Sequence, residues 1–147
     1  PVVVVDFGTA VTFDVVDASG NYTGGIIAPG LSAMTDYLHE KTALLPRIKI
    51  AEPGSVVGRD TRGAMLSGAV HGYRGLIAEL VRQLKRELGT ARLPVVATGV
   101  GGTPELIRDG KTGLLVASGD AQGLAAAIAR LLADGDLRSA LGRAGRD

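Results

Sequence analysis

Asp6-Phe7-Gly8-Thr9-Ala10-Val11-Thr12 is the stretch that decides the fold, because strand-like segments lie on both sides of it. The apolar run 2–5 ends at Asp6, and a second strand-like run over 12–16 begins almost at once. Two strands joined by a tight glycine turn bring a carboxylate, hydroxyl groups and backbone N–H groups to a single tip. An ordinary hairpin with an Asx-type turn is the simpler interpretation of this pattern.

The functional interpretation of the same tip is a site for a nucleotide phosphate and a metal ion. Backbone N–H groups and the Thr9 hydroxyl suit phosphate oxygens, and the Asp6 carboxylate suits a cation held between them. The Asp-x-Gly-Thr pattern alone does not decide between the two interpretations, so the residues that follow it matter.

Five further motifs follow in order along the chain: Gly24-Gly25-Ile26-Ile27-Ala28-Pro29-Gly30-Leu31, Leu45-Pro46-Arg47, Gly58-Arg59-Asp60-Thr61, Met65-Leu66-Ser67-Gly68 and Gly72-Tyr73-Arg74-Gly75-Leu76-Ile77. Together with residues 6–12, this series resembles the type III pantothenate kinases, bacterial enzymes that phosphorylate vitamin B5 in coenzyme A biosynthesis. The resemblance covers about residues 1–95. It implies an actin-like ATPase (ribonuclease H-like) fold, ATP with Mg²⁺ as the phosphate donor, and a monovalent cation, usually K⁺.

The resemblance also implies roles for single residues. Asp6 matches the potassium ligand, and Thr61 matches the residue that contacts the substrate pantothenate. The family usually has Asn where this chain has Asp60. The ATP contacts match three residues of the first hairpin, Gly8, Thr9 and Thr12.

Two family elements are missing from this sequence: an earlier Asp-x-Gly-Asn-Thr phosphate loop, and a Gly-Ala-Asp-Arg segment whose Asp is the general base. Phosphoryl transfer depends on positioning, charge stabilisation and a base that orients the nucleophile. Asp14 and Asp17 offer no replacement, since both lie at the far end of the second predicted strand, where we expect turn residues. We therefore assign no catalytic residue and expect a residual ATP and cation site.

The sequence changes character after residues 94–99, a strand ending in Ala-Thr-Gly that suits the kinase. Three motifs follow: Val100-Gly101-Gly102-Thr103-Pro104-Glu105-Leu106-Ile107, Asp109-Gly110-Lys111-Thr112-Gly113-Leu114-Leu115-Val116, and Gly119-Asp120 leading into Leu124-Ala125-Ala126-Ala127-Ile128. They resemble the end of the nucleotide-sugar domain of a family 4 glycosyltransferase, over about residues 94–147. Gly99 stands where those enzymes have Asp, and their upstream basic pair and paired glutamates are missing. A helix start with free N–H groups predicts a weak alternative anion site at Gly101, Gly102 and Glu105, although a helix cap without ligand is the simpler interpretation.

We expect an α/β protein in which an actin-like half is continued by Rossmann-like strand and helix elements. We expect two segments: a kinase-like segment over 1–93, which contains the Asp6–Thr12 stretch as the second phosphate loop of the family, and a glycosyltransferase-like segment over 94–147. The two segments can share one merged domain. A designed or recombined chimera, or a fused gene fragment, explains the combination better than one intact enzyme. Three functions stay open: a kinase-type ATP site, a nucleotide-sugar site, and a non-catalytic scaffold.

Composition narrows the list of partners. The chain has 147 residues, 46% of them hydrophobic, with 22 glycines and no cysteine, as is typical of an α/β protein without disulfides. A net charge of +1 and 3% aromatic residues argue against nucleic acid and membrane partners. We expect a cytoplasmic protein, because no secretory signal and no apolar run of about 20 residues occurs.

Periodicity and punctuation predict strands at 2–6, 11–17, 22–28, 47–51, 94–98 and 113–116. They predict helices at 30–42, 60–88, 103–108, 121–133 and 137–144, with Gly89 as a stop and with Asp120 and Asp136 as caps of the last two. The helix 60–88 is the expected homodimer interface, since the kinase family is dimeric. We expect no metal or catalytic role for either histidine, His39 or His71.

Overall fold

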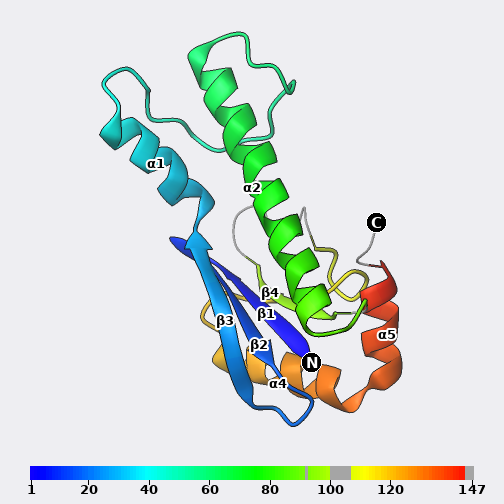
Figure 1. Ribbon diagram of the computed structural model, residues 1–147. Helices are drawn as coiled ribbons and strands as arrows, with labels where there is room; N and C mark the ends of the chain where they lie inside the picture. Colours follow the sequence, from blue (N-terminus) through cyan, green and yellow to red (C-terminus); the bar gives the residue numbers. More distant parts are fainter. Residues whose placement is uncertain (92, 100–106, 145–147) are drawn as a thin grey trace. The chain divides into compact units, whose positions relative to one another are not determined.

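The computed structural model describes residues 1–91, 93–99 and 107–144, which form a mixed α/β structure (Figure 1). Four helices lie among these residues, with one five-stranded sheet. The chain divides into two compact units, which we call the sheet unit (Pro1–Ala28 with Lys85–Asp147) and the helical unit (Pro29–Leu84). The elements are β1 (Val2–Phe7), β2 (Ala10–Val16), β3 (Tyr22–Pro29), α1 (Leu31–Lys41), α2 (Thr61–Glu87), β4 (Val95–Thr98), β5 (Leu114–Val116), α4 (Ala121–Ala133) and α5 (Gly135–Ala144).

The sheet has the strand order β3-β2-β1-β4-β5, so the first strand of the chain lies at its centre. β1 pairs antiparallel with β2, and it pairs parallel with β4, in the register Val5 to Ala97. β4 in turn pairs parallel with β5. The sheet therefore combines strands from residues 2–29 with strands from residues 95–116.

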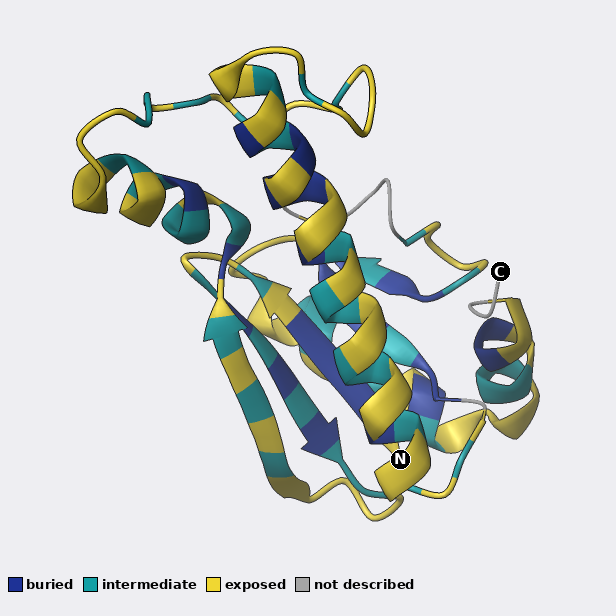
Figure 2. Cartoon of the chain, turned by 45° about the horizontal axis from the view of Figure 1, so that its top comes forward, coloured by how far each residue is buried: buried dark blue, intermediate teal, exposed yellow. Residues whose placement is uncertain are grey.

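The central strand is apolar on both faces over Val2–Val5, as is typical of a strand that is buried on both faces of its sheet. Val2 and Val4 belong to a core cluster with residues of β4, β5, α4 and α5. Leu131 of α4 and Leu141 of α5 complete this cluster, which places α4 and α5 against this face. Residues of the opposite face are also buried, among them Val3, Val5, Val11 and Phe13. In β2 and β3, by contrast, more and less buried residues alternate along the strand (Figure 2).

Local signals set the ends of several elements as predicted. Gly89 adopts a left-handed φ of +62°, and the N–H groups of Gly89 and Thr90 donate to carbonyls of the last turn of α2. Asp120 caps α4, since its Oδ1 accepts from the Gly123 N–H at 2.8 Å. The cap of α5 is Asp134 rather than the predicted Asp136, because Asp134 Oδ1 accepts from the Leu137 N–H at 2.8 Å.

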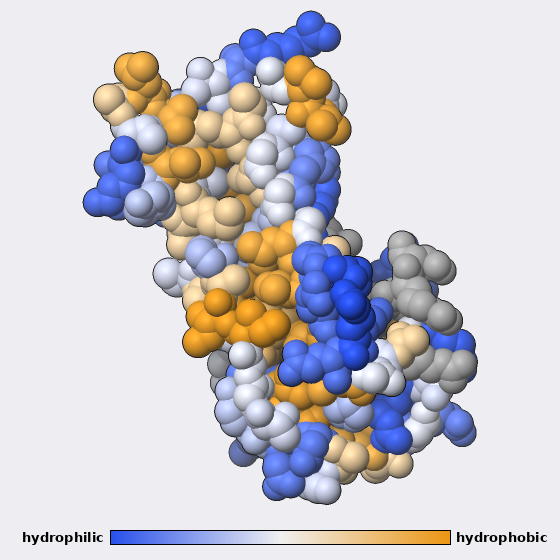
Figure 3. All heavy atoms as spheres, viewed as in Figure 1, coloured by the Kyte–Doolittle hydropathy of each residue, from blue (hydrophilic) through white to orange (hydrophobic). Residues whose placement is uncertain are grey.

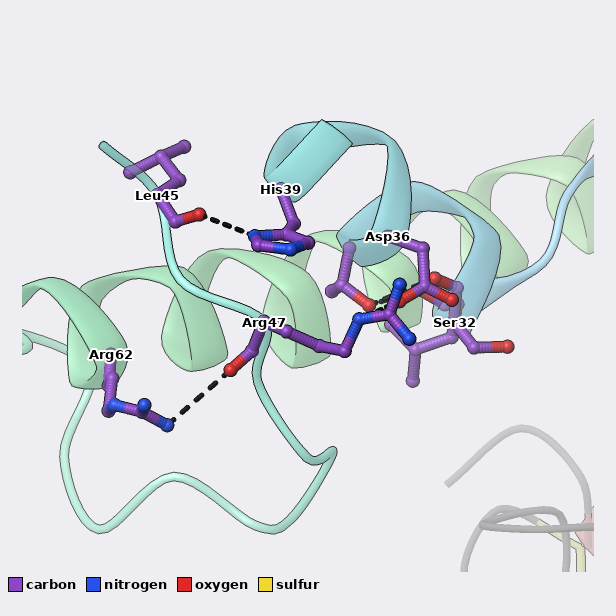
Figure 4. A network of polar contacts seen from close by, with 8 residues as sticks. Ser32, Asp36, His39, Leu45, Arg47 and Arg62 are labelled. Atoms are coloured by element: carbon purple, nitrogen blue, oxygen red, sulfur yellow. Dashed lines mark hydrogen bonds and ion pairs between the residues drawn. The ribbon is translucent and has the colours of Figure 1, made fainter. Parts of the chain in front are cut away.

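The predicted strand at 47–51 is wrong, since this segment has no regular secondary structure. Side chains of the two helices of the helical unit hold it instead (Figure 4). Arg62 of α2 donates to the Arg47 carbonyl, and the Arg47 guanidinium lies 3.8 Å from the Asp36 carboxylate of α1. The Arg47 carbonyl therefore accepts from a side chain, and residues 47–51 pair with no strand among the described residues. The predicted helix 103–108 falls mostly outside the residues that the structure describes.

His39 takes part in the same polar network. Its Nδ1 lies 2.8 Å from the Leu45 carbonyl oxygen, so the imidazole connects α1 to the segment that follows it.

Several large hydrophobic side chains are exposed. Leu44 is 90% exposed, and Val56 and Val57 are also exposed. Figure 3 shows such hydrophobic residues in orange on the surface. Among the described helices, none combines the length and the apolar character needed to cross a membrane.

Candidate functional site

A pocket of about 320 Å³ with both polar and apolar lining residues lies within the sheet unit, where β1, β4 and β5 end. Its sheet wall comes from one face of the sheet, and its opposite wall comes from the segment 117–121 and from α4. Crevices at the carboxyl ends of parallel strands are the usual ligand sites of open α/β sheets. The sheet residues that line the pocket are Val4, Asp6, Thr12, Asp14, Thr98 and Val116.

Asp6 is the predicted cation ligand, and it lies in this pocket. The antiparallel register places Asp6 directly opposite Thr12, so both side chains leave the sheet on the same face. The Thr98 hydroxyl of β4 donates to Asp6 Oδ1 at 2.7 Å and accepts from the Phe7 N–H at 3.0 Å. The carboxylate is therefore exposed to the pocket and held from one side.

Thr12, predicted to contact ATP, also lines the pocket. Its hydroxyl donates to Asp14 Oδ2 at 3.2 Å. Asp14 lies inside β2, opposite Val4, and not among the turn residues that we expected at the far end of the second strand. The alternation of the strand explains its position, because residues 12 and 14 share a face.

Asp17, in contrast, does form the turn between β2 and β3. Its Oδ1 accepts from the N–H groups of Ser19 at 2.8 Å and Asn21 at 2.9 Å. The hydrogen bond from the Asn21 backbone, followed by one from the Asn21 side chain, holds the pKa of Asp17 below its usual value. This carboxylate is committed to the hairpin and has no part in the pocket.

Gly8 and Thr9, the other predicted ATP contacts, lie in the exposed turn between β1 and β2. The Gly8 N–H donates to the Ala10 carbonyl at 2.9 Å, so the turn itself uses this group. Neither residue belongs to the pocket lining. The structure thus brings Asp6 and Thr12 together and places Gly8 and Thr9 in the connection between their strands.

Thr61, the predicted pantothenate contact, is the first residue of α2 and belongs to the helical unit. Asp60 caps this helix, since its Oδ1 accepts from the Gly63 N–H at 2.7 Å and its carbonyl accepts from the Ala64 N–H. A Cβ on Gly58 would come within 2.0 Å of the Ala64 nitrogen, so the chain can approach the helix only with glycine there. The Gly-Arg-Asp-Thr motif is therefore a helix start that presents Thr61 at its tip.

The weak anion site predicted at Gly101, Gly102 and Glu105 lies outside the described residues, and it stays a prediction. Thr98 and Asp120 also line the pocket, and neither was assigned to a functional site from the sequence. Thr98 shares the strand parity of the buried Val96, which indicates the same face of the sheet. Asp120 was recognised only as a cap of α4.

The pocket carries negative charge. Three of its lining residues are aspartates (Asp6, Asp14 and Asp120), and its described lining contains no Lys, Arg or His. Carboxylate and hydroxyl oxygens suit hard cations such as Mg²⁺ and K⁺. The described residues contain no group of three or more His, Cys, Asp or Glu arranged to hold a metal. The pocket therefore offers carboxylate and hydroxyl oxygens, but its described residues form no complete metal-binding cluster.

Fold and site define an α/β protein with an acidic, hydroxyl-bearing pocket at the strand ends. Comparison with known families makes this more specific. Residues 1–83 match the family model of type III pantothenate kinases, and residues 87–147 match that of group 1 glycosyl transferases. Because the first match covers more than half of the 147 residues, the chain belongs to the type III pantothenate kinase family.

Individual relatives agree. The chain is 58% identical over 102 residues to a type III pantothenate kinase of Methylacidiphilum infernorum, and 60% identical over 99 residues to one of Akkermansia muciniphila. These alignments cover 69% and 67% of this chain but only 38% and 40% of the relatives, so the chain spans well under half of their length. An alignment of 102 residues is also longer than the 83-residue family match, so the kinase likeness extends beyond residue 83.

The fold resembles that of a solved structure. It is a crystal structure from Campylobacter jejuni, described as a conserved Baf family transcriptional activator, with a TM-score of 0.55 and 19% sequence identity. The likeness covers 88% of this chain and 57% of the other. At this level of identity it supports the arrangement of the elements and nothing further.

Proposed function

We propose that the chain carries an ATP and cation half-site of a type III pantothenate kinase, in an actin-like half continued by Rossmann-like elements. Asp6 binds K⁺, the hairpin residues Gly8, Thr9 and Thr12 bind the ATP phosphates, and Thr61 contacts pantothenate. The single observation that carries this proposal is the shared pocket of Asp6 and Thr12 at the end of the central strand. We assign no general base, so the proposal concerns binding rather than turnover.

The charge of the pocket decides the form of the ligand. Three carboxylates without a cationic lining residue repel a bare triphosphate at close range. A nucleotide that enters with Mg²⁺, beside a K⁺ on Asp6, brings the positive charge that the side chains lack. ATP affinity should therefore depend on cations far more than in a site lined with lysine or arginine.

We further propose that the segments 1–93 and 94–147 act as one merged domain at this site. The support is the sheet itself, in which β4 pairs with β1 and with β5. The segment 117–121, matched to the glycosyl transferases, forms the second wall of the pocket. A nucleotide bound there would contact residues from both families.

A homodimer through α2 is proposed for the helical unit. The exposed side of this helix carries Gly68, Gly72 and Gly75, and a Cβ on any of them would meet no atom within 4 Å. Small residues on an exposed helix side allow the close approach of a second helix. Sedimentation equilibrium tests the idea: the native chain should be dimeric, and Gly72→Leu should shift it towards monomer.

Calorimetric titration of ATP with Mg²⁺, in potassium and then in sodium buffer, tests the proposed function. The native chain should bind ATP more tightly in potassium buffer, and Asp6→Asn should remove that preference, because the lost charge weakens the cation site. Thr9→Ala should weaken ATP binding in both buffers. ATP affinity that neither substitution changes would overturn the kinase-type site.

A nucleotide-sugar site is the second candidate, favoured by the match of residues 87–147 and by the position of 117–121 in the pocket wall. Titration with UDP-glucose and GDP-mannose separates the two ideas. Binding of either sugar nucleotide without binding of ATP supports the glycosyltransferase type. A cooperative melt that no nucleotide shifts supports a non-catalytic scaffold.

A further inference from the structure

Thr98 is the most buried polar residue of the pocket, with 9% of its surface exposed. The Thr98 hydroxyl donates to Asp6 Oδ1 at 2.7 Å, and the Thr98 hydroxyl oxygen accepts from the Phe7 N–H at 3.0 Å. A threonine hydroxyl has one proton and two lone pairs. The proton is committed to Asp6, and the Phe7 amide fixes the direction in which the hydroxyl points.

The backbone around Thr98 holds this arrangement in place. The parallel register aligns Ala97 with Val5, so Thr98 comes beside Asp6 at the end of β4. The next residue, Gly99, donates its N–H to the Val116 carbonyl at 2.7 Å, which ties the end of β4 to β5. Thr98 is thus anchored from both sides, whereas Asp6 lies at an exposed strand end.

The contact uses only one of the two carboxylate oxygens. Oδ1 of Asp6 accepts from Thr98, and no hydrogen bond from the described residues occupies Oδ2. A hydroxyl that donates to a carboxylate forms a charge-assisted hydrogen bond, which is stronger than a bond between neutral groups. One oxygen is therefore fixed, and the other is left for a ligand.

We infer that Thr98 is a positioning residue, which orients the Asp6 carboxylate so that its second oxygen binds the cation. The inference rests on the proposed function, since it assigns Asp6 to the cation. It adds that the cation site depends on a strand beyond the Asp-x-Gly-Thr hairpin. The bond joins residues 92 positions apart, so a loss of the β1–β4 register would disorder the cation ligand.

Two substitutions of Thr98 separate the hydroxyl from the shape of the side chain. Thr98→Val keeps the branched shape and removes the donor, and it should weaken ATP binding in potassium buffer about tenfold, the cost of a charge-assisted hydrogen bond. The ratio of affinities in potassium and sodium buffer should fall towards one. Thr98→Ser restores the donor, and it should recover both the affinity and the ratio.

Thr35→Val is the matched control, because Thr35 is a buried threonine of the helical unit, 4% exposed, whose hydroxyl donates to main-chain carbonyls. Thr35→Val should lower the melting temperature without changing the ratio of ATP affinities in potassium and sodium buffer. A purely structural role for Thr98 would give the same result in Thr98→Val, with an unchanged ratio, and that result would overturn the inference.

A double-mutant cycle of Thr98→Val and Asp6→Ala, measured by urea unfolding, tests the contact without nucleotide. The losses in free energy of unfolding of the two single variants should sum to more than the loss of the double variant, since each single variant removes the same hydrogen bond. Strictly additive effects would overturn the inference even if ATP binds. A native chain that binds no ATP but shows coupling would instead overturn the proposed function, and the coupling would support Thr98 as the residue that holds Asp6.

Discussion

Asp6 and Thr12 face each other directly across the β1–β2 ladder, and both side chains line the same pocket. Only two short strands and one turn are needed to produce this pairing. The register of the hairpin therefore brings a carboxylate and a hydroxyl to one face of the sheet. Thr12 also donates to Asp14, so the pair is extended along β2 by a second carboxylate.

Thr12→Val should weaken the binding of ATP with Mg²⁺ by a few fold to about tenfold, because one hydrogen bond contributes about 0.5–1.5 kcal/mol. Valine suits a strand, so the melting temperature should change little. Thr23→Val is the control from the neighbouring strand β3, since the Thr23 hydroxyl donates to the Val15 carbonyl and Thr23 is not part of the pocket lining. Calorimetric titration should give native affinity for the control, and equal losses in both variants would remove Thr12 from the site.

Elements with strong local signals were predictable from the sequence. The first three strands, α1 and α2 were predicted to within about two residues. Gly89 and Asp120 were recognised because a left-handed glycine and an N-cap act within one turn of a helix. In the candidate site, Asp6 and Thr12 were predicted for the same reason, since a single hairpin brings them together.

Features that depend on distant partners were not predictable. Arg47–Ala51 alternates like a strand, but the side chains of Arg62 and Asp36 hold it as an irregular segment. Thr98 reaches Asp6 only through the parallel pairing of β1 with β4, which no short sequence window contains. Asp14 lies within the predicted strand 11–17 and shares the parity of Thr12, so its place on the pocket face could have been found from the sequence.

The start of α5 gives a second prediction. Asp134→Ala should lower the free energy of unfolding by about 1 kcal/mol, because it removes the acceptor for the Leu137 N–H. Asp136→Ala should cost less, since Asp136 lies in the first turn and contributes mainly through the helix dipole. Urea unfolding of both variants measures the difference. A larger loss in Asp136→Ala would show that Asp136, and not Asp134, is the cap in solution.

The packing of α4 on the sheet gives a third prediction. Leu131 is fully buried in the cluster that includes Val2 and Val4 of β1, so Leu131→Ala should cost about 2–5 kcal/mol. Amide hydrogen exchange should accelerate in β1 as well as in α4, because one core connects them. Leu44→Ala deletes the same atoms from a side chain that is 90% exposed, and it should cost under about 0.5 kcal/mol. Faster exchange confined to α4 would mean that the helix and β1 do not unfold together.

The ion pair of Glu52 and Arg74 gives the last prediction, one for pH dependence. Two hydrogen bonds from the Arg74 guanidinium, of 2.9 and 2.7 Å, hold the pKa of Glu52 below its usual value. Because the pKa of Glu52 is lower in the folded state, the pair stabilises the fold at pH values above the usual pKa of a glutamate. This stabilisation is lost as the pH falls through the lowered pKa.

An NMR titration of the Glu52 carboxyl carbon should therefore show a midpoint below that of an ordinary glutamate, and Arg74→Gln should raise it. His71→Gln should raise it less, since the charge of His71 is the weakest of the influences that lower the pKa of Glu52. Because both side chains of the pair are partly exposed, added salt should reduce the difference between the native chain and Arg74→Gln. A midpoint that Arg74→Gln leaves unchanged would show that Arg74 does not engage Glu52 in solution, and the segment 47–57 would then depend on its contacts to the Arg62 and Ser67 side chains.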